Sequence, residues 1–354
     1  MRHIATAILL LLGGLCAAQP IDSEYLVKYR PGIRPPAAVV AQPISLRRNL
    51  WRVYSRRAIS PIGVEYIEPN YRIHLLQVND PAQTSQWYLP RINAFQGWQF
   101  SQGSPSVVVA VLDSGVDSTH YDLAGKVLDK ASFVGGDATD RIGHGTRVCG
   151  IIGAITNNGA GMASVGYNTS LIVAKVVTDT NQGSDATLIP AIDWAVARGA
   201  KVINMSVGQR EYSQSLQEAV DAAWEQGVVV VAAAGNNGNT DKVYPAALNN
   251  CIAVAGVDQN DRRATFSSYG SWVHTAAPAV HILSTIPGNR LNFDSGTSFS
   301  SPMVAGAAAL LWANGGRSNY LIRRAIETSG SPIQGFGNYP CLRLDLRQAL
   351  LRFP

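Results

Sequence analysis

Three residues far apart in the chain are of the types that together perform nucleophilic catalysis. Asp113 stands in Asp-Ser-Gly, His144 in Gly-His-Gly-Thr, and Ser298 in Gly-Thr-Ser-Phe-Ser-Ser-Pro. A serine hydroxyl is a poor nucleophile until a base removes its proton, and a histidine can do this near neutral pH. A buried carboxylate then fixes the tautomer of the histidine and stabilises the imidazolium. The chain therefore supplies an acid, a base and a nucleophile, in that order.

Two further features could stabilise an anion that forms beside Ser298. The apolar stretch 303–312 predicts a helix, and Pro302 is expected in its first turn, where a missing N–H costs nothing. Unpaired N–H groups and the helix dipole at such a helix start favour negative charge. Asn236, in Ala-Ala-Gly-Asn just after an apolar run, is a second candidate donor to an oxyanion. Taken alone, Asn236 is better interpreted as an ordinary turn residue.

The elements that must position these residues follow from the hydrophobic pattern. Apolar runs of strand length cover residues 107–112, 171–177, 202–205, 228–233 and 252–257, and helix-length segments cover 147–155, 185–198 and 213–226. Continuous β-branched runs that alternate with helices predict a three-layer α/β/α fold with a buried, mostly parallel sheet. Asp113 directly follows the first run, and His144 is expected to open a helix. Sites in such folds lie at the carboxyl ends of the strands.

The charge distribution argues against a nucleic-acid partner. The net charge is +5, but residues 19–78 carry 9 basic and 4 acidic residues, whereas residues 79–354 carry 19 and 20. A nucleic-acid-binding protein keeps its basic surplus on the working domain. The composition, with 46% hydrophobic and 15% charged residues, also excludes a disordered chain.

The N-terminal segment predicts a secretory signal at residues 1–18. Arg2 precedes an apolar run at residues 4–12, and small residues end at Ala18, after which the cut is expected. The run is too short to span a bilayer comfortably. The alternative is a buried N-terminal strand. Residues 19–78 then predict a small domain of their own, with strands at 25–29 and 64–67.

Three cysteines remain after the signal, so at most one disulfide can form. The favoured pair is Cys251 with Cys341. Cys149 is interpreted as a small buried hydrophobe rather than as a catalytic thiol.

Together, the motifs resemble those of the subtilisin-like serine proteases (subtilases). Asp-Ser-Gly, His-Gly-Thr and Gly-Thr-Ser-x-Ser-Ser-Pro stand in the family's order, with Ala-Ala-Gly-Asn between the second and third. The resemblance covers about residues 79–350. It implies that Asp113, His144 and Ser298 are a catalytic triad that forms an acyl-enzyme, and that Asn236 is the oxyanion donor.

The resemblance also implies a cleft for extended protein substrates. Two chain edges would pair with the peptide backbone: Ser206, Val207 and Gly208 on one side, and Gly183 and Ser184 on the other. The specificity pocket is expected to be lined by residues 206–208 and 232–235, the latter including Ala234 and Gly235, and closed by residues 239–245. Because these residues are small and mostly apolar, we expect broad specificity with an apolar or aromatic residue before the cleaved bond.

A resemblance to the thermitase-like branch of the family implies a structural calcium site. It is carried by Asn-Asp-Pro at 79–81, Asp-Leu-Ala-Gly-Lys-Val at 122–127 and Thr-Asn-Asn at 156–158. Six oxygens would bind Ca²⁺, from the side chains of Asp80, Asp122 and Asn158 and from the carbonyls of Ile155, Ala160 and Met162. The alternative is that Asp80 and Asn158 only cap turns. No organic cofactor is implied.

Residues 19–78 resemble the family's inhibitory propeptide, through Tyr-Leu-Val-Lys-Tyr at 25–29 and Tyr-Ile-Glu-Pro-Asn at 66–70. The resemblance implies a small α+β domain that assists folding, inhibits the enzyme as an intramolecular partner, and is cut off in cis between about Tyr71 and Asp80. The peptidase domain is then residues 79–354. We expect it to be secreted and monomeric, without nucleic-acid or membrane partners.

Three residues depart from the family's motifs without removing a catalytic group. Phe299 follows the nucleophile where Met is usual, and Arg147 and Cys149 replace His and Ala after His-Gly-Thr. Two other functions were weighed. A protein that binds peptides without cutting them is disfavoured because the triad is intact, and a dinucleotide-binding protein because Gly-x-Gly-x-x-Gly does not follow the first strand.

Overall fold

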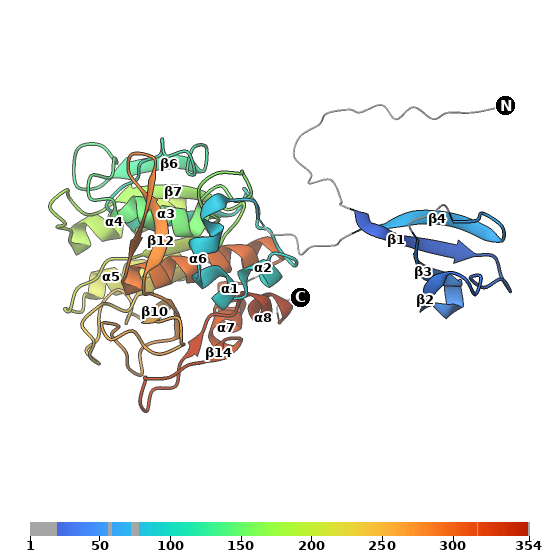
Figure 1. Cartoon of the computed structure of the whole chain (residues 1–354). Helices are drawn as coiled ribbons and strands as arrows, with labels where there is room; N and C mark the ends of the chain where they lie inside the picture. The colour runs from blue at the N-terminus through green and yellow to red at the C-terminus, as the bar shows by residue number, and fades with distance from the viewer. Residues whose placement is uncertain (1–19, 56–58, 72–77, 317, 353–354) are drawn as a thin grey trace. The chain divides into compact units, whose positions relative to one another are not determined.

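The computed structural model describes residues 20–55, 59–71, 78–316 and 318–352. The chain divides into two units, residues 1–77 and 78–354, and each is described by itself (Figure 1). The expected signal segment, residues 1–18, lies outside the described residues. None of the described helices combines the length and the apolar character needed to cross a membrane.

The first unit is an antiparallel sheet with the strand order β2-β3-β1-β4. Its elements are β1 (Pro20–Tyr29), β2 (Val40–Ser45), the 3-10 helix η1 (Leu46–Arg48), β3 (Leu50–Tyr54) and β4 (Val64–Tyr71). Alternate residues point to one face, where Val27, Tyr29 and Val53 form a small buried core. The strands expected at 25–29 and 64–67 are confirmed as parts of β1 and β4.

The second unit is built on a nine-stranded sheet with the order β14-β15-β11-β10-β9-β8-β5-β7-β6. Its strands are β5 (Val108–Asp113), β6 (Val127–Ser132), β7 (Ser170–Lys175), β8 (Val202–Met205), β9 (Val229–Ala233), β10 (Cys251–Val257), β11 (Thr275–Pro278), β14 (Ser331–Pro332) and β15 (Leu342–Arg343). All neighbours in this sheet pair in parallel except β14 with β15. The predicted parallel sheet is therefore confirmed.

Helices cover both faces of this sheet. The remaining elements are η2 (Pro81–Ser85), α1 (Tyr88–Arg91), α2 (Ala94–Gly97), α3 (His144–Gly153), α4 (Asp185–Ala197), α5 (Gln214–Glu225), the hairpin of β12 (Ile282–Ile286) and β13 (Arg290–Asp294), α6 (Thr297–Ala313), α7 (Asn319–Thr328) and α8 (Leu346–Leu351). Val109 and Val111 of β5 pack with α3 and α6, whereas Ala110 and Leu112 pack with α4 and α5. The three-layer α/β/α prediction holds because successive strand residues face opposite layers.

Helix α6 begins earlier than the sequence predicts. It starts at Thr297, so Pro302 is its sixth residue, and the expectation that Pro302 lies in the first turn is wrong. The apolar pattern starts only at residue 303, but Phe299, Ser300 and Ser301 before it are buried as well. A proline inside a helix cannot donate to the carbonyl four residues earlier. Pro302 therefore leaves the carbonyl oxygen of Ser298 free for another donor.

The predicted disulfide is also wrong, because Cys149, Cys251 and Cys341 are all free and buried. Cys251 opens β10, whereas Cys341 precedes β15, and β11 lies between these two strands. Two strand spacings amount to about 9–10 Å, which exceeds the separation that a disulfide can bridge. Burial raises the pKa of the Cys251 and Cys341 thiols to about 12. Cys149 is fully buried, as its interpretation as a small hydrophobe predicts.

The approach of α3 to the turn after β5 allows no side chain at Gly145. A Cβ there would lie 2.1 Å from the carbonyl oxygen of Gly115, whereas a Cβ at Gly153 on the same helix would meet only the Leu171 side chain, at 3.1 Å. We expect Gly145→Ala to lower the free energy of unfolding by about 3 kcal/mol. Gly153→Ala is the control, with a change below about 1 kcal/mol because helix propensity offsets the crowding. Urea unfolding measures both, and equal effects would contradict this close approach.

Candidate active site

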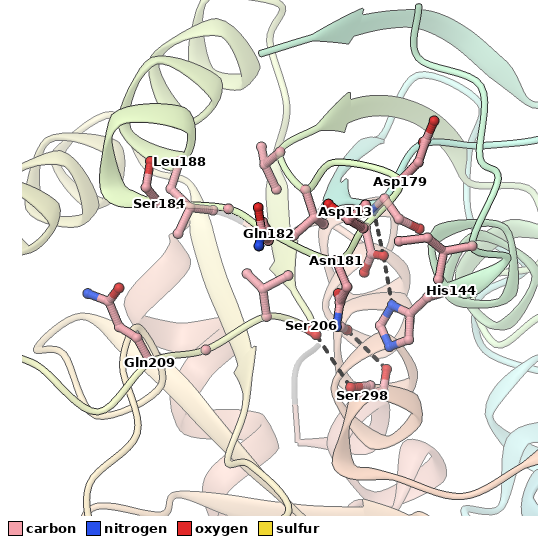
Figure 2. Close-up of a pocket in the computed structure, with 18 of the residues that line it drawn as sticks. Asp113, His144, Asp179, Asn181, Gln182, Ser184, Leu188, Ser206, Gln209 and Ser298 are labelled. Atoms are coloured by element: carbon pink, nitrogen blue, oxygen red, sulfur yellow. Dashed lines mark hydrogen bonds and ion pairs between the residues drawn. The ribbon is translucent and has the colours of Figure 1, made fainter. Parts of the chain in front are cut away.

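The fold brings the three predicted catalytic residues to one place. Asp113 is the last residue of β5, His144 is the first of α3, and Ser298 is the second of α6. Residues of both helices pack in one buried cluster against the same face of the sheet. All three side chains line one end of a single pocket, and Figure 2 shows the His144 ring beside Ser298.

A short hydrogen bond joins Asp113 to His144. Nδ1 of His144 lies 2.7 Å from Oδ1 of Asp113, whose side chain is 1% exposed, against 30% for His144. Because a carboxylate can only accept, Nδ1 carries the proton and Nε2 remains free to accept one. The partial burial of His144 favours its neutral form, but the Asp113 charge and hydrogen bond outweigh this and raise the pKa of His144 above 6.5.

Asp140, which the sequence analysis did not single out, holds the start of α3 in place. This carboxylate is 3% exposed and accepts five hydrogen bonds. The donors are Ser114 Oγ at 2.9 Å, Ile142 N at 3.1 Å, Gly143 N at 2.7 Å, Thr146 N at 2.8 Å and Thr146 Oγ1 at 2.7 Å. Ser114 Oγ in turn accepts from Gly145 N at 2.9 Å. An acidic residue just before a helix start was the sequence signal that could have identified it.

Ser298 is tied to the end of β8 through Ser206. Ser298 Oγ donates to the Ser206 carbonyl at 3.3 Å, and Ser206 Oγ donates to the Ser298 carbonyl at 3.0 Å. The second bond uses the carbonyl that Pro302 leaves free. Asn204 Nδ2 donates to Ser206 Oγ at 3.0 Å. Among the described residues, no hydrogen bond joins Ser298 to His144.

Asn236 is held by one end of its side-chain amide. Its Oδ1 accepts from Thr297 N at 2.9 Å and from Thr297 Oγ1 at 3.0 Å. Its Nδ2 has no hydrogen-bond partner within the described part of the chain. Contacts with Thr297, the neighbour of Ser298, therefore fix the amide and leave its donor group available.

The pocket has a volume of about 1090 Å³ and runs between two chain segments. Figure 2 shows Asn181, Gln182 and Ser184 along one side and Ser206 and Gln209 along the other. The predicted edge residues Gly183, Ser184, Ser206, Val207 and Gly208 all line it. The backbone groups of Gly183, Val207 and Gly208 make no hydrogen bond with any described residue. Both edges can therefore pair with an extended chain.

Ala234 and Gly235 are not among the residues that line this pocket, although Tyr244 is. The reason is the side chain of Val243. A Cβ at Gly208 would lie 2.7 Å from Val243 Cγ1, and a Cβ at Gly235 would lie 3.0 Å from Val243 Cγ2. Val243 thus fills the space between these two glycines.

The predicted calcium ligands converge on one place. Asp122 Oδ1 accepts from Asn158 Nδ2 at 3.1 Å, and Asp80 accepts from the backbone N–H groups of Asn157 at 2.8 Å and Asn158 at 3.1 Å. Burial raises the pKa of Asp80 and of Asp122, and the charge of Asp80 raises the pKa of Asp122 further. Neither carboxylate has an ion-pair partner among the described residues.

The carbonyl oxygens expected at this site are also free. No hydrogen bond of the described residues ends on the carbonyl oxygen of Ile155, Ala160 or Met162. The described residues contain no group of three or more His, Cys, Asp or Glu side chains suited to a metal. Two buried carboxylates without a cationic partner, next to unpaired carbonyls, nevertheless fit a hard cation such as Ca²⁺.

Comparisons with known proteins agree with this arrangement. The model of the Subtilase family matches residues 104–337. The chain is 45% identical to Thermophilic serine proteinase of Bacillus sp. (strain AK1), over 78% of this chain and 70% of that protein. It is 45% identical to Thermitase of Thermoactinomyces vulgaris, over 74% of this chain and 94% of that one. A solved protease from Pseudoalteromonas arctica PAMC 21717 superposes with a TM-score of 0.71 at 28% identity, covering 78% of this chain and 99% of that one.

The Asp113–His144 bond predicts how the histidine titrates. In Asp113→Asn the negative charge is lost, so we expect the pKa of His144 to fall below its wild-type value. NMR titration of the histidine ring measures this change directly. Asp137→Asn is the matched control, because Asp137 is an exposed acid that pairs with Arg141. An unchanged His144 midpoint in Asp113→Asn would show that Asp113 does not set the pKa.

Proposed function

The chain belongs to the subtilase family and is a subtilisin-like serine endopeptidase, and we propose that Asp113, His144 and Ser298 are its catalytic triad. One observation carries the assignment. The 2.7 Å bond between Asp113 Oδ1 and His144 Nδ1 leaves Nε2 of His144 beside Ser298, in the same pocket. In this arrangement Ser298 is the nucleophile, His144 is the base and Asp113 is the group that orients the base.

In the proposed reaction, the Ser298 hydroxyl turns from the Ser206 carbonyl to Nε2 of His144. Nε2 takes the proton while Oγ attacks the carbonyl carbon of the peptide bond. The imidazolium, stabilised by Asp113, then gives its proton to the leaving amine, and an acyl-enzyme remains. A water molecule, deprotonated by His144, attacks the ester and releases Ser298.

We propose that Asn236 and the start of α6 stabilise the oxyanion of each tetrahedral intermediate. The Nδ2 group of Asn236 is free because Thr297 occupies only the amide oxygen. The backbone N–H of Ser298 belongs to the first turn of α6, where it has no partner within the helix. Donors that are already oriented stabilise developing charge without a reorganisation cost.

The substrate is proposed to be an extended segment of protein, held mainly through its backbone. The free backbone groups of Gly183, Val207 and Gly208 support this, because pairing through the main chain tolerates many side chains. An apolar or aromatic residue is proposed before the cleaved bond, and Val243, which fills the space between Gly208 and Gly235, limits the room for it.

Residues 19–78 are proposed to be an inhibitory propeptide, and the enzyme a self-processing zymogen. The boundary between the two units falls after Gln77, close to the proposed cut between about Tyr71 and Asp80. The basic surplus of this segment is compatible with electrostatic docking to the peptidase unit. We further propose that residues 1–18 direct secretion and that the mature enzyme is a monomer without nucleic-acid or membrane partners.

We also propose a structural calcium site formed by Asp80, Asp122 and Asn158 with the carbonyls of Ile155, Ala160 and Met162. Its support is the pair of buried carboxylates without cationic partners and the three free carbonyl oxygens described above. A bound Ca²⁺ supplies the missing positive charge. It also ties the residues before η2 to the loop after α3, which stabilises the unit against local opening.

Replacement of the nucleophile tests the catalytic proposal. We expect Ser298→Ala to lower kcat by about 10⁶-fold, since no other residue supplies the attacking oxygen. Intact-protein mass spectrometry of secreted wild type and variant tests processing. Wild type is expected to start between Ile73 and Asp80, and Ser298→Ala to remain untrimmed. A normally trimmed Ser298→Ala protein would refute processing in cis.

Chelation tests the calcium proposal. Ca²⁺ at about 100 times its Kd adds roughly 2.7 kcal/mol of stability, so EDTA should lower the Tm by about 5–10 °C. Asp80→Ala and Asp122→Ala are expected to melt at this lower temperature with or without EDTA. Asp137→Ala, at an exposed acid outside the cluster, should keep the full response. Identical wild-type melting curves with and without EDTA would reject the site.

A further inference from the structure

Phe299 stands between the candidate base and a buried arginine. Its ring centroid lies 5.8 Å from that of His144, and the guanidinium carbon of Arg147 lies 5.7 Å from the Phe299 ring centre. Arg147 is one turn after His144 on α3, and its side chain is only 11% exposed. Neither Arg147 nor Phe299 lines the substrate pocket. The three side chains thus lie in a row beside the cleft, with Phe299 next to both others.

The β12–β13 hairpin fixes the other side of Arg147. Nη1 donates to the Asn292 carbonyl at 2.9 Å, and Nε lies 3.7 Å from an oxygen of Asp294. The Arg147 carbonyl accepts from Ser284 Oγ at 2.7 Å. Because the guanidinium is planar and has several fixed donors, it can hold the hairpin and cover an aromatic face at the same time.

We propose that Arg147 and Phe299 act as one coupled pair of positioning residues that sets the placement and the proton affinity of His144. The proposal rests on the proposed role of His144 as the base. Phe299 restricts the ring from the side of α6, and Arg147 restricts Phe299. Each of the two therefore depends on the other for its effect.

The pair coincides with two of the three departures from the family's motifs. In the family, Met usually follows the nucleophile and His usually stands at the position of Arg147. A methionine offers no ring to the guanidinium, and a histidine side chain is too short to span both the ring and the hairpin carbonyl. The two departures touch in space, so each is expected to be favourable only when the other is present.

The charges around His144 predict a pH signature. The negative charges of Asp113, at the end of β5, and Asp140, in the loop before α3, favour the imidazolium form of His144. The positive charge of Arg147 disfavours it, and Asp294 on β13 faces Arg147. Lys175, on the strand beside Asp113, donates to Asp179. Without the charge of Arg147, the pKa of His144 rises. The acid limb of the kcat/KM profile, which requires neutral His144, then moves to higher pH.

A double-mutant cycle on the full chain, processed as it is secreted, tests the coupling. Arg147→His and Phe299→Met are each expected to lower kcat about tenfold with little change in KM. In the double variant kcat is also expected to fall about tenfold, whereas two independent sites would give a fall of about a hundredfold. Arg147→Lys keeps the charge, so its acid limb should stay near the wild-type position while kcat falls. Arg198→His is the control, since the guanidinium carbon of Arg198, just after α4, lies 5.9 Å from the ring centre of Trp194 in a similar contact.

A double variant whose fold-loss in kcat equals the product of the single fold-losses would overturn the coupling. Arg147→Gln removes the charge without adding a titratable ring, and an acid limb that does not shift in this variant would overturn the charge role of Arg147. NMR titration of His144 in a Ser298→Ala background repeats the cycle without activity. An inactive wild type would contradict the proposed function, whereas additive His144 midpoints would contradict only the coupled pair. Thermal unfolding of every variant identifies any that fail to fold.

Discussion

A carboxylate buried at the end of a central strand is the constraint on which the candidate site depends. Asp113 is 1% exposed, and its Oδ2 has no hydrogen-bond partner among the described residues. Burial of a charge is costly unless it is paired, so the bond from His144 Nδ1 is structural as well as chemical. The same bond decides which nitrogen of His144 faces Ser298. The stability of the Asp113 carboxylate and the proposed reactivity of His144 as a base thus depend on one contact.

Much of the surrounding structure serves to keep that contact in place. The Asp140 carboxylate joins the turn after β5 to the first turn of α3 through Ser114, so the acid and the base cannot move independently. Gly145 lets the helix approach the turn more closely than any side chain would allow. On the other side, Pro302 frees the Ser298 carbonyl for Ser206 and so ties α6 to β8. Each of these contacts is a small local interaction, but together they fix the relative positions of β5, α3 and α6 at one end of the pocket.

The pocket beside these residues also depends on a few local features. Its two edges are loop segments outside the strands, and the backbone groups of Gly183, Val207 and Gly208 within them make no hydrogen bond with any described residue. A sheet buried on both faces leaves few other places for free backbone groups. Beside one edge, the Val243 side chain fills the space between Gly208 and Gly235. We therefore propose that pairing with the substrate backbone and selection by side-chain size depend on different residues.

The sequence by itself determined the architecture and the chemical groups. The apolar runs predicted β5, β7, β8, β9 and β10, and the order of the Asp113, His144 and Ser298 motifs predicted their meeting at the strand ends. These features are visible because hydrophobic periodicity and short motifs are local properties of a chain. The pairing of Cys251 with Cys341 and the start of α6 were predicted wrongly, since both depend on which elements become neighbours. Only the tertiary structure decided that Ser114 donates to Asp140, that Val243 fills the space between Gly208 and Gly235 and that Arg147 packs on Phe299, because each contact joins residues whose separation in the sequence carries no signal of their closeness in space.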